Sequence, residues 1–313
     1  MTNPKIAIVS DWSTNTNGFE QFMHSLHEAL PNALFYTDFI TPDTRSKFKT
    51  LNISTAYSSK FLHNFYKFFP IFQEKIFKKL NLSKFDIIIT NDRNSMKIQK
   101  NRKNQIHICY FRGISNPKKS DQQSAQNVDI FIADSAKTQK NIKQHYNKPS
   151  TVIHPPVDVD RFEPARIRGD YYLMSGHQLS NNQIKLAKLA ATKIGIKINI
   201  NTSGNDKQSF VTALNNSKGY ISLSPDSFDP AQVEALAAGS PVIAYNKDIG
   251  SDIVQNSESG ILFDRLTIDS LTDAIQQAEQ IDFLPGTLRR KAKRFDKSLF
   301  ITKIRKIVYD QTN

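Results

Sequence analysis

The chain has 313 residues, of which 39% are hydrophobic and 23% charged. This length exceeds one ordinary core and fits two domains of typical size, and the composition excludes a largely disordered chain. The single cysteine, Cys109, excludes an internal disulfide, and no run of about 18 apolar residues could span a bilayer. Because the first residues run directly into a strand-like segment without a long apolar signal region, we expect a cytoplasmic protein.

The net charge of +13 is unevenly distributed. Residues 1–150 contain 22 Lys and Arg against 11 Asp and Glu, which gives +11 and leaves +2 for the remainder. This asymmetry favours an anionic surface or a polyanion as partner, although a lysine-rich composition gives the same bias in many cytosolic proteins. No aromatic platform or recognition motif accompanies the charge, so we expect no nucleic-acid partner.

Short runs of β-branched or aromatic residues recur along the chain, with helical stretches between them. The runs lie at residues 5–12, 33–39, 85–90, 106–111, 128–135, 171–176, 196–200, 219–224 and 241–245. Alternation of strand and helix predicts parallel sheets covered by helices on both faces. The first helix follows Asn17 and Gly18, where apolar residues recur at helical spacing in GFEQFMHSLHEAL.

A segment rich in proline and charge, residues 149–170, separates the two sets of strands and predicts the domain junction. Within it Asp158 and Asp160 form a D-x-D pair, for which a turn in a linker is a better interpretation than a metal site, because no other oxygen ligands cluster nearby. Residues 289–306 predict one amphipathic basic helix, with Phe295, Leu299 and two isoleucines for packing. No internal repeat and no Gly-rich ATP or dinucleotide motif is present.

The segment SPDSFDPAQVEALAAGSPVIAYN, residues 224–246, places acids around the start of a helix. Residues 219–224 predict a buried strand, Pro230 suits the first helical position, and Gly239 suits the end. Unpaired N–H groups at such a helix start favour a phosphate. We expect Glu234, one turn inside, to accept hydrogen bonds from ribose hydroxyls.

This arrangement resembles family 4 glycosyltransferases of the GT-B fold, whose acidic pair is Glu-x7-Glu around a Phe-Gly step. Other segments resemble the same family in order, and a subgroup similar to bacterial O-antigen mannosyltransferases in particular. They are KIAIVSDW, FDIIIT, HICYF, VDIFIADSAKTQKNIKQHY, TVIHPPVDVDRFEP, DYYLMSG, SGILFD and KRFDKSLF. The resemblance implies an α/β fold with two Rossmann-like domains whose parallel sheets face across a cleft. It implies an acceptor domain at residues 1–160, a nucleotide-sugar domain at 161–295, and a C-terminal helix at 296–313 packing back on the first domain.

Site roles are implied by the same resemblance. Asp226 would hold a hydroxyl of the donor sugar, Glu234 the ribose, and backbone N–H groups near Phe228 the sugar and phosphate. The loop containing Asn17 and Gly18 matches the family's Gly-Gly loop near the diphosphate, and Asp252 matches a further acid. Such enzymes retain the anomeric configuration and use no metal and no cofactor.

The chain departs from the family pattern at four places. His177 and Asn182 stand where the family has a basic pair, Arg-x4-Lys, that neutralises the diphosphate. Arg112 replaces the first-domain histidine and joins Asp226 as a candidate catalytic residue. Asp229 replaces the glycine of the Phe-Gly step and is a strong candidate for the helix N-cap, where its carboxylate would compete with phosphate. The second domain also lacks about one strand-helix unit.

Two functions follow. The first is a retaining transferase that moves a hexose, with mannose from GDP-mannose as candidate, to a lipid-linked intermediate of surface-polysaccharide (lipopolysaccharide, O-antigen) biosynthesis. The second is a catalytically impaired, glycosyltransferase-like scaffolding protein in a glycan assembly complex. Residues 60–80 alternate seven aromatics with five lysines, which suits peripheral contact with the inner membrane surface, but equally an ordinary helical pair.

Overall fold

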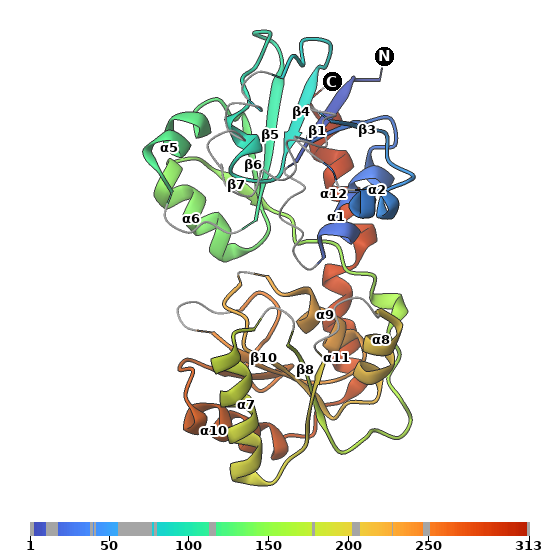
Figure 1. Ribbon diagram of the computed structural model, residues 1–313, viewed down its shortest axis with the longest axis vertical. Helices are drawn as coiled ribbons and strands as arrows, with labels where there is room; N and C mark the ends of the chain where they lie inside the picture. Colours follow the sequence, from blue (N-terminus) through green and yellow to red (C-terminus); the bar gives the residue numbers. More distant parts are fainter. Residues whose placement is uncertain are drawn as a thin grey trace. The chain divides into compact units, whose positions relative to one another are not determined.

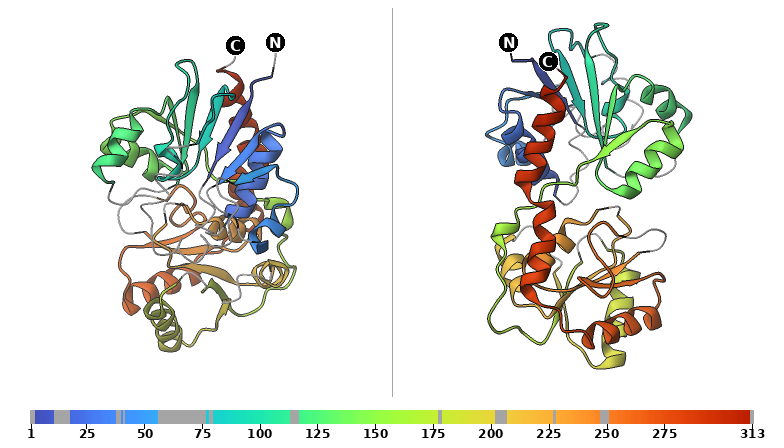
Figure 2. Two further views of the ribbon diagram at one scale, coloured as in Figure 1. Left: turned by 45° about the horizontal axis from the view of Figure 1, so that its top comes forward. Right: turned by 180° about the vertical axis from the view of Figure 1, so that it is seen from behind.

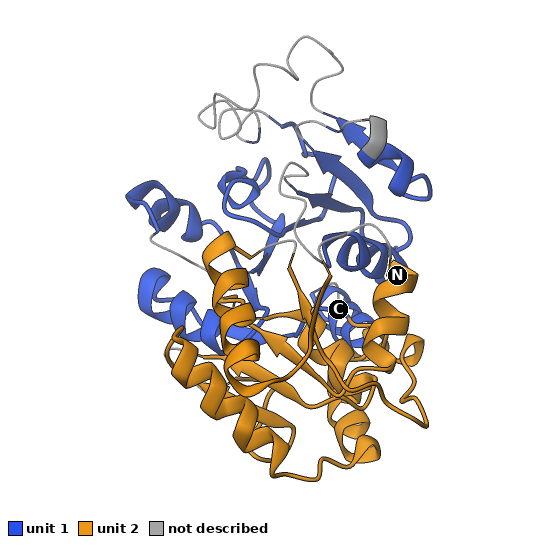
Figure 3. Cartoon of the chain, turned by 60° about the horizontal axis from the view of Figure 1, so that its bottom comes forward, with its two compact units in different colours: residues 1–156, 300–313 blue, residues 157–299 orange. Residues whose placement is uncertain are grey.

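The computed structural model describes most of the chain, in two compact units (Figure 3). Unit 1 contains residues 1–156 and 300–313, and unit 2 contains residues 157–299. The described residues are 3–10, 18–37, 40, 42–55, 77, 80–112, 117–176, 179–201, 207–226, 228–246 and 251–311.

Unit 1 is built on a parallel sheet of seven strands in the order β3-β2-β1-β4-β5-β6-β7 (Figure 1). The strands are β1 (Ile6–Val9), β2 (Leu34–Thr37), β3 (Ile53–Thr55), β4 (Ile87–Thr90), β5 (Ile106–Phe111), β6 (Ile130–Ala133) and β7 (Ser150–Val152). The helices are α1 (Phe19–Ala29), α2 (Pro42–Lys47), η1 (Ser95–Lys97), α5 (Lys119–Ala125), α6 (Ala136–Tyr146) and α12 (Lys297–Tyr309).

Each face of this sheet carries its own apolar core, because successive strand residues point to opposite faces. On β1, Ile6 and Ile8 join the core that α1 and α12 complete, whereas Ala7 and Val9 belong to the opposite face. The helices α5 and α6 pack on that opposite face, over β5 and β6. The strands are therefore buried on both sides, which explains their continuous apolar runs.

The C-terminal helix α12 packs on the same face of unit 1 as α1 (Figure 2). Phe300 meets Phe22 of α1 with ring centroids 5.6 Å apart, and the guanidinium of Arg305 donates to the carbonyl of Ala29 at 3.0 Å. The prediction of one continuous helix over 289–306 is wrong. Asp296 has extended backbone between the two helical stretches, and its carboxylate caps α12 by accepting from the Ser298 N–H at 2.9 Å.

Unit 2 is built on a parallel sheet of five strands in the order β12-β11-β10-β8-β9. The strands are β8 (Tyr172–Ser175), β9 (Ile198–Asn201), β10 (Gly219–Ser222), β11 (Val242–Tyr245) and β12 (Gly260–Phe263). The helices are η2 (Val159–Arg161), α7 (Asn181–Ile194), α8 (Lys207–Asn215), α9 (Pro230–Ala237), α10 (Ile268–Glu279), α11 (Pro285–Ala292) and η3 (Lys293–Phe295). The helices α7 and α10 share one apolar core with the sheet, and α8, α9 and α11 share the other.

All nine predicted runs overlap a strand of the structure, and the prediction of parallel sheets covered on both faces is confirmed. The sequence did not reveal β3, β7 and β12. Two of them are three residues long and half-exposed, so they carry no buried apolar run. The third, β12, is absent from the predicted strands, although its residues lie in the segment SGILFD that resembles the family.

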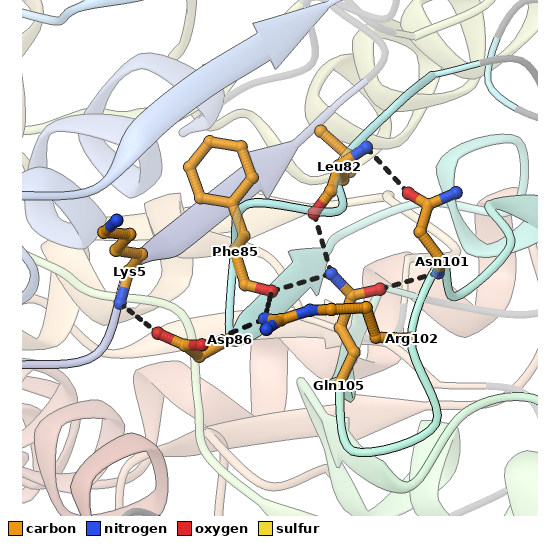
Figure 4. A network of polar contacts seen from close by, with 7 residues as sticks. All are labelled: Lys5, Leu82, Phe85, Asp86, Asn101, Arg102 and Gln105. Atoms are coloured by element: carbon orange, nitrogen blue, oxygen red, sulfur yellow. Dashed lines mark hydrogen bonds and ion pairs between the residues drawn. The ribbon is translucent and has the colours of Figure 1, made fainter.

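A polar network fixes the amino-terminal edge of the unit 1 sheet (Figure 4). The buried amide of Gln105 donates to the carbonyls of Leu82 and Phe85 at 2.8 Å each and accepts from the Asn101 N–H at 2.9 Å. Asp86, just before β4, accepts from the Lys5 N–H and from the Arg102 guanidinium, each at 2.9 Å. The network ties together the chain segments that precede β1, β4 and β5.

Replacing Gln105 by alanine should lower the free energy of unfolding of unit 1 by about 2 kcal/mol, because it removes three hydrogen bonds of a buried amide and leaves the Asn101 N–H without its partner. The carbonyls of Leu82 and Phe85 keep one partner each, the Phe85 N–H and the Arg102 guanidinium. Denaturant unfolding followed by circular dichroism measures the change. Ligands of parallel sheets bind at the opposite, carboxyl edge, so nucleotide binding should stay unchanged in Gln105→Ala. A loss of binding with unchanged stability would contradict the structural role.

Candidate functional site

The carboxyl ends of β8 and β10 meet at the point where the strand order of unit 2 reverses. The chain passes from β8 outward to β9 and then returns to β10 on the other side of β8. In open α/β sheets such a reversal point is where ligands bind. The side chain of Gln183 in the first turn of α7 donates to the carbonyl of Leu223 at 2.9 Å, which fixes the start of α7 beside the end of β10.

The loop after β10 leads into α9, which begins at Pro230 as predicted. Gly239, just beyond the helix, has a φ of 74°, a left-handed conformation that favours glycine. Two arginines donate to carbonyls at this end of the helix: Arg289 to Ala237, the last residue of α9, at 3.1 Å, and Arg168 to Gly239 just beyond it. The C-terminal end of α9 is thus bonded to side chains of unit 2.

Asp229 is the N-cap of α9, which confirms the predicted capping role. Its carboxylate accepts from the Ala231 N–H at 3.0 Å and from the Ser222 hydroxyl at 2.7 Å, while its carbonyl accepts from the Gln232 N–H at 3.1 Å. Pro230 has no N–H to offer. The expectation of unpaired N–H groups at this helix start is therefore wrong for Ala231 and Gln232, because Asp229 itself occupies them.

The Asp229 carboxylate lies in a closed polar network. The buried amide of Gln232 donates to the Ser222 hydroxyl at 3.0 Å, and Ser222 in turn donates to Asp229. Burial raises the pKa of Asp229, and the hydrogen bonds from Ser222 and Ala231 oppose this rise. The capping carboxylate is held by three neighbours on β10 and α9.

Glu234 lies one turn further along α9 and is half-buried, whereas every other residue from 231 to 238 is buried. Its pKa is raised to about 8, chiefly by burial and also by the Asp229 carboxylate, while Arg161 and Lys207 oppose the rise. A carboxyl group on an otherwise buried, apolar helix costs stability, and such a costly group with a shifted pKa points to a functional role. Its perturbed ionisation makes Glu234 the strongest functional candidate of unit 2.

The structure brings three predicted acids of unit 2 together. Asp226 is exposed in the loop after β10, and its charge raises the pKa of Asp229, which does the same to Glu234. Phe228 lies between Asp226 and Asp229 in the sequence, and its side chain is buried, with its ring 5.7 Å from that of Phe295. The predicted backbone role of Phe228 stays a prediction, and its side chain is a core residue.

The remaining predicted donor residues of unit 2 lie on other segments. Asn182 is exposed in the first turn of α7, next to the residue that contacts Leu223. Asp252 is half-buried, and its carbonyl accepts from the Arg294 guanidinium at 3.4 Å. His177 lies outside the described residues.

Three predicted residues belong to unit 1. Gly18 immediately precedes α1 with a φ of 76°, while Asn17 beside it lies outside the described residues. The Arg112 guanidinium follows β5 and lies over the rings of Phe19 and Phe22, 5.4 Å from each centroid. Burial lowers its pKa, and the nearby Tyr110, Asp92 and Asp134 oppose that shift.

Sequence reasoning missed the cations beside Glu234. Arg161 of η2 and Lys207 at the start of α8 both lie close enough to lower its pKa. Arg161 lies in the segment predicted as the domain junction, and no motif points to Lys207; only contacts of α9 with η2 and α8 bring them to the acid. In unit 1 it also missed Ser10 and Asn91, buried side chains directly after β1 and β4. The Ser10 hydroxyl and the Asn91 amide oxygen have no hydrogen-bond partner in the structure as described.

Within the described ranges, no group of three or more His, Cys, Asp or Glu side chains is placed to hold a metal ion. Asp158 directly precedes the short helix η2 and Asp160 lies within it, where Asp160 pairs with Arg289 at 3.4 Å. No helix in the part of the chain that the structure describes is long and apolar enough to cross a membrane. The aromatic and lysine-rich segment at 60–80 lies mostly outside these ranges.

Solved structures that share the fold include a glycosyltransferase, the protein Alr3699/HepE and a synthase. A glycosyltransferase from Rickettsia africae ESF-5 matches with a TM-score of 0.77 at 17% identity, over 100% of both chains. Anabaena Alr3699/HepE, solved in complex with UDP-glucose, matches with a TM-score of 0.72 at 13% identity, over 98% of this chain and 100% of its own. Sucrose-phosphate synthase from Thermosynechococcus elongatus matches with a TM-score of 0.73 at 14% identity, over 99% of each chain. No curated protein matches the sequence.

Two family models divide the chain as the two sheets do. The model described as Glycosyltransferase Family 4 matches residues 16–161, and the model described as Glycosyl transferases group 1 matches residues 172–297. Fold and sequence therefore define the class: the chain is a glycosyltransferase of the GT-B type. Within that class it carries a family 4 domain followed by a group 1 domain, which confirms the resemblance at the level of the family.

Proposed function

We propose that the chain transfers a hexose from a nucleoside-diphosphate sugar to a lipid-linked intermediate of a surface glycan, with retention of configuration and without a metal. The observation that carries the proposal is Glu234, a half-buried carboxyl group that interacts with Asp229 on the helix following β10, one of the two strands at the reversal point of the unit 2 sheet. Similar structures bind UDP and UDP-glucose, which supports a nucleotide-sugar donor.

In the proposed complex, unit 2 holds the donor. The ionised Glu234 carboxylate accepts hydrogen bonds from both ribose hydroxyls, a charge-assisted contact that is stronger than one between neutral groups. Asp226, exposed in the loop after β10, accepts from a hydroxyl of the sugar. Arg161 and Lys207, the cations that act on Glu234, neutralise the phosphates in place of the basic pair that the family uses. The donor roles of Asn182, His177 and Asp252 stay predictions.

Unit 1 holds the acceptor in this proposal. Ser10, Asn91 and Arg112 follow adjacent strands of its sheet, so their side chains lie along one carboxyl edge beside the Gly18 turn. A buried hydroxyl and a buried amide oxygen without partners suit the hydroxyl groups of a saccharide. Arg112 suits the phosphate of a lipid-linked saccharide, presented at the inner face of the membrane.

Calorimetric titration with UDP, GDP, UDP-glucose and GDP-mannose tests the donor site. Binding of at least one of these ligands in the micromolar to millimolar range is expected, with product formation when a lipid-linked acceptor is supplied. Absence of binding at millimolar concentration would refute the enzyme proposal. Nucleotide binding without transfer to any acceptor would instead favour the second candidate function, a scaffolding protein. The replacement of the family's basic pair is the observation that supports this candidate.

Donor affinity should depend on pH through Glu234. The ribose hydroxyls bind the carboxylate form, and below the pKa of about 8 the ionised fraction falls up to tenfold per pH unit. The affinity of the protein for the nucleotide sugar should therefore rise from pH 6 to 8 and become constant above about pH 8.5. A nucleotide sugar is the appropriate probe because its diphosphate loses no proton in this range. A flat profile in the unmodified protein would contradict the ribose role of Glu234.

A further inference from the structure

The helix start that leads into the proposed donor site is already occupied by an anion of the chain itself. Helix N-termini bind phosphate through their first free N–H groups. In α9 the first position is Pro230, the Ala231 N–H is bonded to the Asp229 carboxylate, and the Gln232 N–H is bonded to the Asp229 carbonyl. The donors nearest the end of the helix are therefore unavailable to a ligand.

Asp229 is fixed in this position rather than able to swing away. Its second carboxylate oxygen accepts from Ser222 at 2.7 Å, and the Ser222 hydroxyl accepts from the Gln232 amide at 3.0 Å. Ser222 and Gln232 are both buried, and they belong to β10 and α9, the two elements that the loop connects. A phosphate could displace the carboxylate only by breaking this buried network, which is costly.

The charges around Asp229 add to the effect. Asp226 and Glu234 are near enough to interact with the Asp229 carboxylate, and Arg161 and Lys207 are the cations that act on Glu234. Three interacting carboxyl groups thus lie around the start of α9, where a diphosphate would bring further negative charge. Such an arrangement opposes the phosphates but leaves the ribose contact with Glu234 in place.

We propose that Asp229 is an affinity-setting residue, whose carboxylate occupies the anion position at the start of α9 and weakens binding of the donor's diphosphate relative to its nucleoside. This inference rests on the proposed function of unit 2 as a donor site. Asp229 acts through the phosphates of donor and product, so it also favours release of the nucleoside diphosphate after transfer. A glycine or a neutral side chain at this position gives tighter retention of the product.

The test compares Asp229→Asn and Asp229→Gly with the unmodified protein. Asparagine keeps an oxygen to accept from Ala231 but removes the charge, and glycine is a tolerated N-cap that leaves the Ala231 N–H free. Titrations measure the affinity of a nucleoside diphosphate and of its nucleoside, using UDP with uridine or GDP with guanosine. Both ligands carry the same ribose, so any change in Glu234 cancels in the ratio of the two affinities.

We expect the ratio of diphosphate affinity to nucleoside affinity to rise about tenfold in both variants. This is the effect of removing one nearby negative charge from a partly buried phosphate site. Asp269→Asn is the matched control, since it removes one carboxylate from an exposed ion pair on α10 and should leave the ratio unchanged. Ratios within twofold of the unmodified protein in both Asp229 variants would overturn the inference while the donor site stands. Failure of the unmodified protein to bind any nucleotide would overturn the proposed function itself. Thermal melting by circular dichroism confirms that each variant is folded.

Discussion

Replacing Glu234 by glutamine should weaken binding of the nucleotide sugar and at the same time stabilise unit 2. Glutamine cannot offer the two charged acceptors of a carboxylate, so affinity should fall about 10- to 100-fold above pH 8. Below pH 6, where Glu234 itself is protonated, the two proteins should differ much less. Calorimetric titration across this pH range measures both limits.

The stability effect has the opposite sign. The pKa of Glu234 rises from the ordinary 4.5 to about 8 on folding, so its favourable contribution is complete below pH 4.5 and is lost as the pH rises through 8. Glutamine carries no charge at any of these pH values. At pH 9 the free energy of unfolding of Glu234→Gln should therefore exceed that of the unmodified protein by about 1–3 kcal/mol. At pH 5 the difference should be much smaller.

Denaturant unfolding at the two pH values measures this difference, and hydrogen exchange of the α9 amides assigns it to unit 2, since a two-domain chain need not unfold in one step. Glu234→Ala serves as a second variant that removes every acceptor. A glutamine variant that is less stable at pH 9 would show that Glu234 has a structural partner in its ionised form. That result would remove the main reason for assigning it to a ligand.

Replacing Asp121 by asparagine should destabilise unit 1 by about 3–5 kcal/mol. Asp121 on α5 is fully buried and pairs with Lys97 at 3.2 Å and with Arg93 at 3.3 Å. It also accepts from the Lys118 N–H at 2.8 Å, which starts α5. The Lys97 side chain is 5% exposed, so loss of the carboxylate leaves its charge in a largely dry environment.

The matched control is again Asp269→Asn. Asp269 pairs with Lys193 at 2.6 Å, a shorter distance, but both side chains are more than half exposed. Solvent and salt screen such a pair, so its loss should change the free energy of unfolding by no more than about the error of a denaturant titration. Equal costs for the two variants would show that distance, rather than burial, determines the value of an ion pair in this chain.

Much of the fold follows from local sequence. The runs that became strands are dense in isoleucine, phenylalanine and tyrosine, and Pro230, Asp229 and Gly239 specify the start and end of α9 by their own backbone and side-chain chemistry. Local signals failed where an element depends on its neighbours. The short edge strands β3 and β7 pair with only one neighbouring strand each, and the interruption at Asp296 lies inside a stretch with continuous helical character.

Local sequence predicts only part of the candidate site. Glu234 and Asp226 could be named from their register with a known family, and Asp229 from the rules of helix capping. The sequence alone thus determined which side chains are present and what each can do near its own position in the chain. The tertiary structure alone decided that Arg161 and Lys207 act on Glu234, that Ser222 and Gln232 lock Asp229, and that burial shifts the ionisation of both acids. The physical reason is that helix caps and strand runs depend on neighbours within a few residues, whereas desolvation and charge interactions depend on residues that only the folded chain brings together.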